Sequence, residues 1–321
     1  MKLKILSAGK LPESIIQKYS DEFDFIIPER TLTYDEVYEL IDQADGYFIM
    51  NGIKADRNMI NKGTKLKVVG NFGVGYDCID WNYCTEKGIA VVNTPTQVSD
   101  ATAEHTACLI FDTMRGIARS DRQVRNRIWY APEFPDHNTA INGSTLGIIG
   151  FGRIGKLVCK KAQGMGMNVI YYDKFRASEE IEKEFGVTYM EFEEVLAKAD
   201  CISVHMPYIP ENHHIINAGT LKKMKSKAYL VNAARGPIVD EKALCEALKN
   251  GVIRGAGLDV YENEPHPYEG LYELDNVVLT PHCASGTMKA RLGMAKEALD
   301  GITAVLKGKQ PCNVVNPEIF K

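Results

Sequence analysis

The chain has 321 residues, of which 45% are hydrophobic and 25% are charged, and its formal net charge is −4. This length exceeds the roughly 250–300 residues at which a single core usually splits, so two domains are expected. Without long basic or apolar runs, the sequence indicates no nucleic-acid partner and no membrane span. The eight cysteines include no C-x-x-C pair, so neither a metal site nor a disulfide framework is predicted, and a cytoplasmic location is expected.

Short apolar runs alternate with amphipathic segments over the first 95 residues. The runs predict buried strands at 3–6, 23–27, 46–50, 66–72 and 89–93, and the segments between them have helical spacing. This βαβ alternation predicts a parallel sheet that is covered by helices on both faces.

A long helix is expected next, from Asp100 to Arg127, with its apolar residues in the first half and its charged residues in the second. After a polar loop, six further strands are predicted at 145–150, 168–173, 201–206, 228–234, 253–260 and 276–281. Alternating with helices, they outline a doubly wound dinucleotide-binding domain. A final helix is expected from Met288 to Lys307.

The segment GFGRIG at 150–155 follows a predicted strand and opens a predicted helix, which is the context that a dinucleotide fingerprint requires. Gly150 permits a tight turn, Gly152 lets the backbone approach a pyrophosphate, and Gly155 lets the helix pack close to the strand. The helix N-terminus would face the phosphates. The pattern predicts a dinucleotide site.

The next predicted strand ends in Asp173. A carboxylate at this position would accept hydrogen bonds from the adenosine ribose hydroxyls and repel a 2′-phosphate, which favours NAD as the cofactor. Lys174 and Arg176 lie close enough in sequence to leave NADP as the alternative.

Three residues after strands of the second lobe have the side chains that carbonyl reduction needs. Arg235 follows VNAA, Glu264 lies in the DVYENEP segment, and His282 follows LTP. Ligands of open α/β sheets gather beyond the carboxyl ends of the strands, so these side chains are expected near one another. Each alone is also typical of a surface ion pair, a turn residue or a structural histidine.

The motifs GFGRIG, NAARGPIVD, DVYENEP and TPHCASGT resemble, in this order and spacing, those of the D-isomer-specific 2-hydroxyacid dehydrogenase family. NFGVGYDCID, VVNTPTQVSDATAEH and NVVNPEIF are most similar to its glyoxylate/hydroxypyruvate reductase branch. The resemblance implies an α/β fold of two doubly wound parallel-sheet domains with the active site in the cleft between them. The expected domains are a flavodoxin-like substrate domain (1–99 and 287–321) and a Rossmann NAD-binding domain (100–286).

The resemblance also implies a catalytic trio. His282 would protonate the substrate carbonyl oxygen, and Glu264 would fix the tautomer of its ring and favour the imidazolium form. Arg235 would hold the 2-oxo acid at its carboxylate and carbonyl. On the first lobe, the substrate-binding residues would be the amides of Val74 and Gly75, with Asn51 lining the pocket.

Further cofactor contacts are implied along the second lobe. The backbone of Arg153 and Ile154 would meet the pyrophosphate, and Asp259 would bind the nicotinamide carboxamide. The remaining cofactor-binding residues would be Thr102, His205, Met206, Pro207, Ala233, Ala234, Arg235 and His282. The long helix and residues 129–138 resemble the family's dimerisation region, so a homodimer through the NAD-binding domain is expected.

The predicted function is NAD(H)-dependent reduction of a small 2-oxo acid, such as glyoxylate or hydroxypyruvate, to the D-2-hydroxy acid. A dehydrogenase for branched, aromatic or sugar acids is one alternative, and a redox-sensing binding protein resembling the family's corepressors is another. His105, His213 and His214 are interpreted as structural. Cys283 lies beside the predicted proton donor, and the sequence leaves open whether oxidation of this thiol affects the enzyme.

Overall fold

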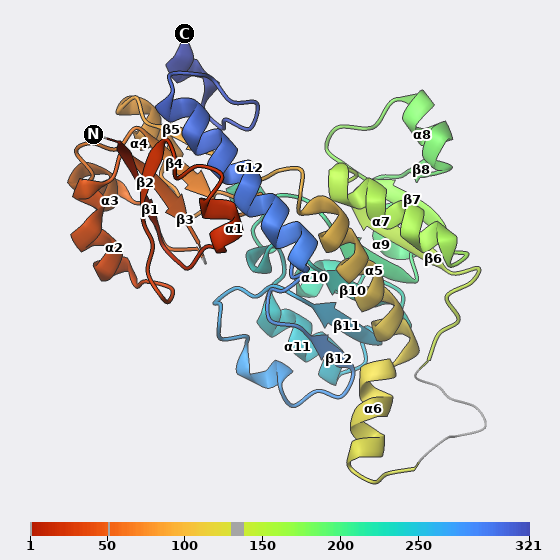
Figure 1. Ribbon diagram of the computed structural model, residues 1–321. Helices are drawn as coiled ribbons and strands as arrows, with labels where there is room; N and C mark the ends of the chain where they lie inside the picture. The colour runs from red at the N-terminus through yellow and green to blue at the C-terminus, as the bar shows by residue number, and fades with distance from the viewer. Residues whose placement is uncertain (1, 51, 130–137) are drawn as a thin grey trace. The chain divides into compact units, whose positions relative to one another are not determined.

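The computed structural model describes residues 2–50, 52–129 and 138–321, and the chain divides into two compact units (Figure 1). Unit 1 contains Met1–Val98 and Gly286–Lys321, and unit 2 contains Ser99–Ser285. Each unit has a parallel β-sheet and its own hydrophobic core.

Unit 1 is built on a five-stranded sheet in the order β2-β1-β3-β4-β5. All of its strand pairs are parallel, and the order is that of flavodoxin-like folds. Its strands are β1 (Leu3–Ser7), β2 (Phe23–Ile26), β3 (Gly46–Ile49), β4 (Val68–Asn71) and β5 (Ala90–Val92). The predicted parallel sheet of the first lobe is confirmed.

Short helices connect the strands of unit 1, and three of them have side-chain caps. The helical elements are α1 (Glu13–Ile16), α2 (Tyr34–Leu40), the 3-10 turn η1 (Ile41–Gln43), α3 (Arg57–Lys62) and α4 (Trp81–Glu86). The side chains of Thr33, Asp56 and Asp80 accept hydrogen bonds from first-turn N–H groups of α2, α3 and α4. Such caps satisfy backbone donors that a helix leaves unpaired, which fixes where each helix begins.

The last part of the chain completes unit 1. Helix α12 (Met288–Leu306) packs across β3, β4 and β5, so closely that a Cβ at Gly70 would lie 2.6 Å from the Cδ1 of Ile302. After it, the buried Asn316 accepts a hydrogen bond from the Val91 N–H and donates one to the Ile89 carbonyl. The chain ends in η5 (Pro317–Phe320). Unit 1 is therefore discontinuous in sequence.

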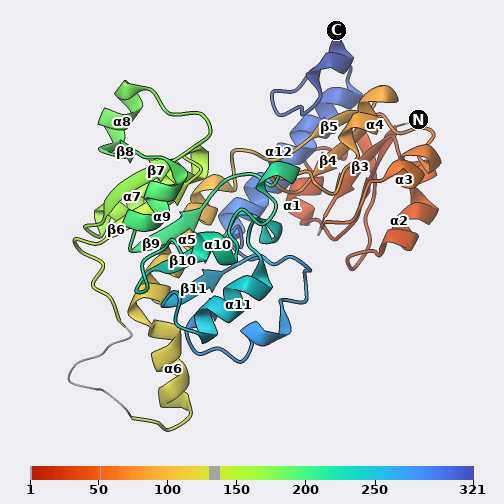
Figure 2. The same ribbon diagram turned by 180° about the vertical axis from the view of Figure 1, so that it is seen from behind.

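Unit 2 is built on a seven-stranded parallel sheet in the order β12-β11-β10-β9-β6-β7-β8 (Figure 2). Counted from its first strand, this is the 3-2-1-4-5-6 order of dinucleotide-binding folds with one strand added. Its strands are β6 (Thr145–Ile149), β7 (Asn168–Tyr172), β8 (Thr188–Tyr189), β9 (Cys201–Val204), β10 (Tyr229–Asn232), β11 (Gly255–Leu258) and β12 (Val277–Leu279). The order reverses between β6 and β9, and ligands of such folds bind there.

Both faces of this sheet are buried. Ile149 and Leu230 belong to one core cluster, while Ile148 and Val231, their neighbours in sequence, belong to the other. Successive strand residues point to opposite faces, so strands that are apolar at every position pack helices on both sides. The helical elements of unit 2 are α5 (Ser99–Arg115), α6 (Ile117–Arg125), α7 (Arg153–Gly164), α8 (Glu179–Phe185), α9 (Phe192–Lys198), η2 (Pro210–Asn212), α10 (Ala218–Leu221), η3 (Gly236–Ile238), α11 (Glu241–Lys249) and η4 (Glu269–Leu271).

Two details differ from the sequence prediction. The helix predicted from Asp100 to Arg127 is two helices, because Gly116 has a φ of +64° and ends α5 in the left-handed conformation. Strand β8 was not predicted, since its two residues are too few to show a periodicity. Among the residues that the structure describes, no helix combines the length and apolar character needed to cross a lipid bilayer.

Candidate active site

The glycine fingerprint forms the turn between β6 and α7. Gly150 has a φ of +97°, and a Cβ there would lie 2.6 Å from the Met206 backbone nitrogen. A Cβ at Gly155 would lie 2.3 Å from the Gly150 carbonyl oxygen, so the helix meets the loop at backbone distance. A Cβ at Gly152, in contrast, would meet nothing within 4 Å. The open side at Gly152, at the start of α7, fits a pyrophosphate bound by N–H groups of the first turn, which include those of Arg153 and Ile154.

Asp173 follows β7 and is bound to the glycine loop. Its Oδ2 accepts a hydrogen bond from the Phe151 N–H at 2.7 Å, and its Oδ1 accepts one from the Phe175 N–H at 2.9 Å. The nearby Arg176 donates two hydrogen bonds to Glu182, at 2.8 and 2.9 Å. These bonds, together with one from Tyr171, lower the pKa of Glu182 to about 2. The guanidinium that left NADP open in the sequence is thus engaged by a carboxylate.

The loop after β9 meets the glycine turn at the point where the strand order reverses. The His205 N–H donates to the Ile149 carbonyl at 2.7 Å, and its Nε2 lies 2.8 Å from the Ser203 hydroxyl. Burial lowers the pKa of His205 to about 4, which keeps its ring neutral. Met206 and Pro207 follow in the same loop.

The loop after β10 presents Arg235. Asn232, which is buried at the end of the strand, accepts a hydrogen bond from the Ala234 N–H and donates one to the Arg235 carbonyl. The Arg235 guanidinium donates to the Ala234 carbonyl at 2.7 Å. The segment that includes Ala233 is therefore shaped by one asparagine that sequence reasoning missed. Its only signal was its position at a strand end.

Glu264 and His282 form a close pair. The His282 Nδ1 lies 2.7 Å from the Glu264 Oε2, and the other carboxylate oxygen accepts a hydrogen bond from the Tyr261 N–H at 3.1 Å. Burial alone would raise the pKa of Glu264, but the bond to His282, the charge of that ring and the charge of Arg235 hold it below its usual range. The structure thus brings the three predicted catalytic residues together at the carboxyl ends of β10, β11 and β12.

Asp259 holds the loop that carries His282. Its carboxylate accepts hydrogen bonds from the Thr280 hydroxyl and from the N–H groups of Cys283 and Ala284, and its carbonyl accepts one from the His282 N–H. The side chain is wholly buried. Burial would raise its pKa, but these bonds and one from His105 lower it, so the carboxylate is ionised. Its predicted contact with the nicotinamide stays a prediction.

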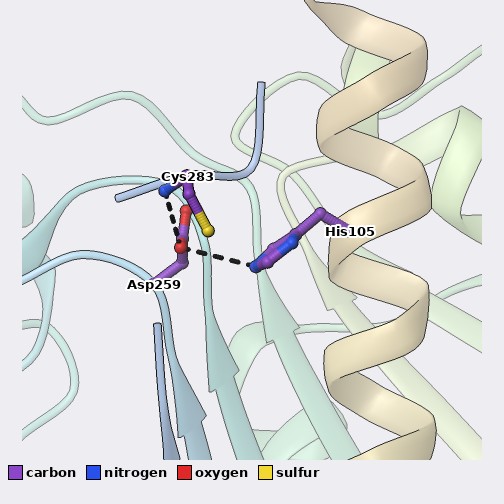
Figure 3. Close-up of side chains that lie close together, drawn as sticks. All are labelled: His105, Asp259 and Cys283. Carbon is purple, nitrogen blue, oxygen red and sulfur yellow. Dashed lines mark hydrogen bonds and ion pairs between the residues drawn. The ribbon is translucent and has the colours of Figure 1, made fainter. Parts of the chain in front are cut away.

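His105, interpreted from sequence as structural, lies against this carboxylate. Its Nε2 is 3.4 Å from the Asp259 Oδ1 (Figure 3). The same nitrogen is 3.1 Å from the Thr280 hydroxyl. Thr102 lies one turn earlier on α5, where it is buried. Of these two residues of α5, only Thr102 was predicted to lie near the cofactor, because the partner of His105 is 154 positions away in the chain.

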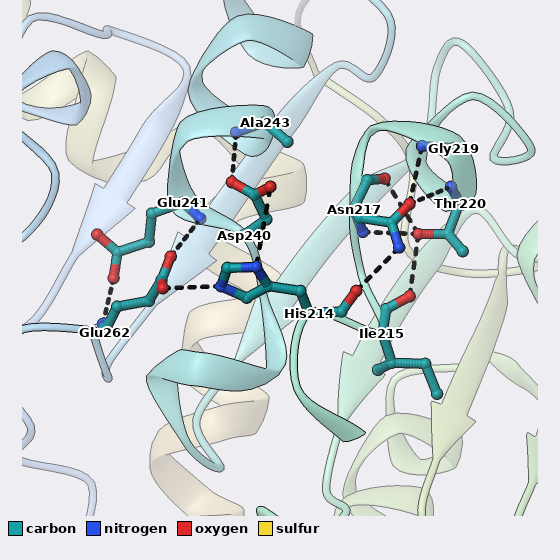
Figure 4. Close-up of polar contacts among 9 residues, drawn as sticks. All are labelled: His214, Ile215, Asn217, Gly219, Thr220, Asp240, Glu241, Ala243 and Glu262. Atoms are coloured by element: carbon teal, nitrogen blue, oxygen red, sulfur yellow. Dashed lines mark hydrogen bonds and ion pairs between the residues drawn. The ribbon is translucent and has the colours of Figure 1, made fainter. Parts of the chain in front are cut away.

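A polar clasp joins the loops of Arg235 and Glu264 (Figure 4). The Glu241 N–H donates to the Glu262 carboxylate, and the Glu262 N–H donates to the Glu241 carboxylate. The His214 Nε2 lies 2.8 Å from the Glu262 Oε2. The two backbones touch at Gly236, where a Cβ would lie 1.9 Å from the Tyr261 carbonyl carbon. No local motif in the sequence predicts this contact between His214 and Glu262.

In unit 1, the loop after β4 carries Val74 and Gly75, whose amides are predicted to bind the substrate carboxylate. The Gly73 carbonyl accepts a hydrogen bond from the Thr94 N–H, and the Val74 carbonyl accepts one from the Asn93 side chain. In a trans peptide the N–H points opposite to the carbonyl, so the amides of Val74 and Gly75 face away from this support. Asn71 holds the Gly75 carbonyl. Asn51, the other predicted substrate contact, lies outside the described residues.

Residues 107–284 match the family described as D-isomer specific 2-hydroxyacid dehydrogenase, NAD binding domain. Over 328 aligned residues the chain is 39% identical to a glyoxylate reductase of Pyrococcus furiosus, with 100% of this chain and 97% of that protein covered. The chain belongs to the D-2-hydroxyacid dehydrogenase family. It is therefore an oxidoreductase that acts on a CH–OH group, and the predicted family and branch are confirmed.

Solved structures agree in fold. The crystal structure of a glyoxylate reductase from Paecilomyes thermophila has a TM-score of 0.87 and 30% identity, covering 99% of both chains. An NADPH-dependent glyoxylate/hydroxypyruvate reductase from Sinorhizobium meliloti, in complex with citrate, has a TM-score of 0.86 and 28% identity, covering 100% of this chain and 99% of that one. Membership of this family therefore establishes a binding domain for a nicotinamide dinucleotide. Individual residues of that domain decide between NAD and NADP.

Proposed function

We propose that this dehydrogenase reduces a small 2-oxo acid of the glyoxylate or hydroxypyruvate type to the D-2-hydroxy acid, with NADH as the reductant. The observation that carries the proposal is the 2.7 Å contact between His282 and Glu264, with the charge of Arg235 acting on the same carboxylate. A proton donor, the group that orients it and a cation are what carbonyl reduction requires of the protein.

On this proposal one atom of His282 transfers the proton. Its Nδ1 is engaged by Glu264, so Nε2 is the atom that gives a proton to the carbonyl oxygen and takes it back in the reverse reaction. The Glu264 carboxylate stabilises the imidazolium form. The bound nicotinamide supplies or accepts the hydride.

Substrate binding is shared between two kinds of donor. The Arg235 guanidinium would pair with the 2-oxo acid and stabilise charge that develops on the carbonyl oxygen. The Val74 and Gly75 amides would bind its carboxylate, as a turn of successive N–H groups binds anions. On this assignment unit 1 is the substrate-binding domain and unit 2 the nucleotide-binding domain. The similarity to relatives named glyoxylate reductase supports a small substrate.

The residues after β7 support NADH over NADPH. The Asp173 carboxylate lies at the strand end where the ribose hydroxyls are read in such folds, and it would repel a 2′-phosphate. Arg176, the cation best placed in sequence to offset that repulsion, is held by Glu182.

Oxidation of NADH and of NADPH across a panel of 2-oxo acids, from glyoxylate to aromatic acids, tests the proposed reaction. The expected result is turnover that is fastest with the smallest acids. The His282→Ala variant should lose about 10²–10⁴-fold in kcat, the usual contribution of a general acid, while its Kd for NADH is nearly unchanged. His213→Ala, which alters an exposed histidine of the same unit, is the matched control. Binding of NADH without turnover of any 2-oxo acid would contradict the enzyme assignment.

The cofactor assignment has its own test. Asp173→Ser should raise kcat/KM for NADPH relative to NADH, since the repelling charge is lost. Adding Glu182→Gln should raise it further, because Arg176 is released to meet a 2′-phosphate. If the ratio is the same in the wild type and in both variants, the 2′ position is read elsewhere.

We further propose a homodimer through unit 2. None of the nine residues described in α6 is buried, and this helix extends beyond the end of α5 in both views (Figures 1 and 2). Large apolar side chains are exposed on and just after it: Ile117, Val124, Ile128 and Trp129. A second copy that covers them would explain this exposure.

A further inference from the structure

We propose that His105, Asp259 and Cys283 form a binding site for a borderline-soft divalent cation of the zinc type, and that the bound ion inhibits the enzyme. The three side chains come from α5, from the loop after β11 and from the loop after β12 (Figure 3). One ligand atom from each, a ring nitrogen, a carboxylate oxygen and a sulfur, lies within 4.8 Å of the other two. We call them the His-Asp-Cys cluster.

The separation of two ligand atoms already suits a tetrahedral ion. The His105 Nε2 lies 3.4 Å from the Asp259 Oδ1. An ion bound at about 2.1 Å from each atom, with a tetrahedral angle between the bonds, holds such a pair about 3.4 Å apart. The ion would take the place of the hydrogen in the present contact. The Cys283 sulfur then needs to approach by a side-chain rotation, which its partly exposed position allows.

The chemistry of the ligand set selects the class of ion. Imidazole, thiolate and one carboxylate together favour Zn²⁺ and Co²⁺, whereas Mg²⁺ and Ca²⁺ prefer ligands that are all oxygen. Asp259 brings a buried negative charge, and the thiolate of Cys283 would bring a second. A divalent cation neutralises both. Three protein ligands leave a fourth position for water.

Outer hydrogen bonds hold the central ligand in place. The Thr280 hydroxyl and the Cys283 N–H donate to the Asp259 Oδ1, and the Ala284 N–H donates to its Oδ2. Bonds of this kind orient a ligating carboxylate and contribute to metal affinity. The His105 side chain is 23% exposed, so an ion from solvent can reach the cluster at this histidine.

The same geometry explains why the sequence predicted no metal. The three ligands stand at positions 105, 259 and 283, without the close cysteine or histidine spacing of zinc motifs. Only the parallel sheet brings the ends of β11 and β12 together beside α5.

Inhibition follows from what Asp259 and Cys283 support. The His282 N–H donates to the Asp259 carbonyl, and Cys283 is the next residue in the chain. An ion bound between Asp259 and Cys283 therefore lies against the loop that positions His282. It also blocks the side of Asp259 that is proposed to meet the nicotinamide, and this part of the inference rests on the proposed function.

Titration of the metal-free enzyme with Co²⁺ tests the site without any turnover. Binding at the His-Asp-Cys cluster is expected to give one equivalent of bound Co²⁺, a thiolate-to-cobalt charge-transfer band in the near ultraviolet, and release of cobalt on addition of Zn²⁺. Cys283→Ser should abolish the band, and His105→Gln should weaken binding at least about 10-fold. Cys108→Ser, which alters an exposed thiol on the same helix as His105, is the matched control and should behave as the wild type.

Three results would overturn the site: no band with millimolar Co²⁺, a band that persists in Cys283→Ser, or an unchanged affinity in His105→Gln. Circular dichroism of each variant establishes that it is folded, so that loss of binding is a local effect.

The inhibitory role has a separate test. Zn²⁺ should reduce NADH oxidation by the wild type, EDTA should restore it, and Cys283→Ser should keep a larger share of its own metal-free activity. Zn²⁺ should also raise the Kd for NADH. Cobalt binding together with unchanged activity and NADH affinity would refute the inhibition but leave the metal site. An enzyme that binds cobalt yet turns over no 2-oxo acid would refute the proposed function alone.

Discussion

Two carboxylates in the same region of unit 2 have pKa values shifted in opposite directions. Burial raises the pKa of Glu241, and the nearby charges of Glu262 and Glu264 add to that rise against two backbone hydrogen bonds. The pKa of Glu264 is lowered, because its bonds to His282 and Tyr261 and the charge of Arg235 outweigh its burial. Environments that push neighbouring acids apart separate their roles. Glu264 is the one that stays ionised and partners the proton donor.

Glu264→Gln therefore should change the pH dependence of reduction. A lowered carboxyl pKa means that the charge beside His282 is present above that pKa and is lost as pH falls through it. Reduction needs a protonated His282, so without the carboxylate the alkaline fall in kcat/KM should begin at a lower pH. The pH profile of NADH oxidation is the measurement. Glu269→Gln, an exposed glutamate of the same unit, serves as the control, and an alkaline limb that stays in place would remove Glu264 from this role.

The residues that do the proposed chemistry could be predicted from the sequence, whereas those that hold them could not. Arg235, Glu264 and His282 stand in local motifs at strand ends. Asn232 and Asn93 act through hydrogen bonds to backbone atoms, and an asparagine near a turn is common without such a role. His105 meets Asp259 only because the sheet brings α5 and β11 together.

At the scale of elements, the clasp between η3, α11 and the loop after β11 sets where Arg235 and Glu264 lie. Glu241 receives hydrogen bonds from the N–H groups of Glu262 and Tyr268 and is itself buried. His214 reaches the same carboxylate pair, and its N–H donates to the Pro237 carbonyl beside Arg235. Each loop thus depends on the other for its backbone partners.

Glu241→Ala should loosen both loops at once. Two part-buried N–H groups, of Glu262 and Tyr268, lose their acceptor, and the cost is at most about 1–3 kcal/mol each, the value for fully buried groups. We expect kcat/KM to fall about 10-fold or more, with the Kd for NADH changing less, and the alkaline limb to shift toward lower pH as in Glu264→Gln. Glu246→Ala, an exposed position on α11, is the matched control. A variant that loses stability but keeps the wild-type pH profile would make Glu241 structural only.

The strands and most helices could be predicted because their apolar periodicity is local. What the sequence did not reveal are features decided by one backbone conformation or by neighbours in space. One helix was predicted over residues 100–127, but the left-handed conformation of Gly116 divides it into two. The two residues of β8 become a strand only by pairing with β7.

At the scale of the whole molecule, the order of segments explains why the fingerprint begins near the middle of the chain. Unit 2 is inserted into unit 1, and the last residues return to it through α12 and Asn316. The buried Asn316 side chain bonds the backbone at both Ile89 and Val91, so this end of the chain is part of the first sheet's structure rather than a tail.

The surface of α6 carries the last prediction, which concerns assembly. Ile117, Val124 and Trp129 are 61%, 56% and 88% exposed, far more than apolar side chains of this size in a core. A symmetric dimer would bury the same patch on both copies, and the burial of large apolar side chains contributes about 1.5–3 kcal/mol each. Sedimentation equilibrium of the full chain should therefore give about twice the 35.7 kDa of one copy.

Val124→Asp should shift this equilibrium toward the monomer, because an unpaired charge in an apolar interface is costly to desolvate. Met165→Asp, at an exposed apolar position after α7, should leave the mass of the dimer unchanged. Circular dichroism of both variants separates dissociation from unfolding. A wild type that sediments as a monomer at micromolar concentration would end the proposal, and a dimer that survives Val124→Asp would place the interface on another face.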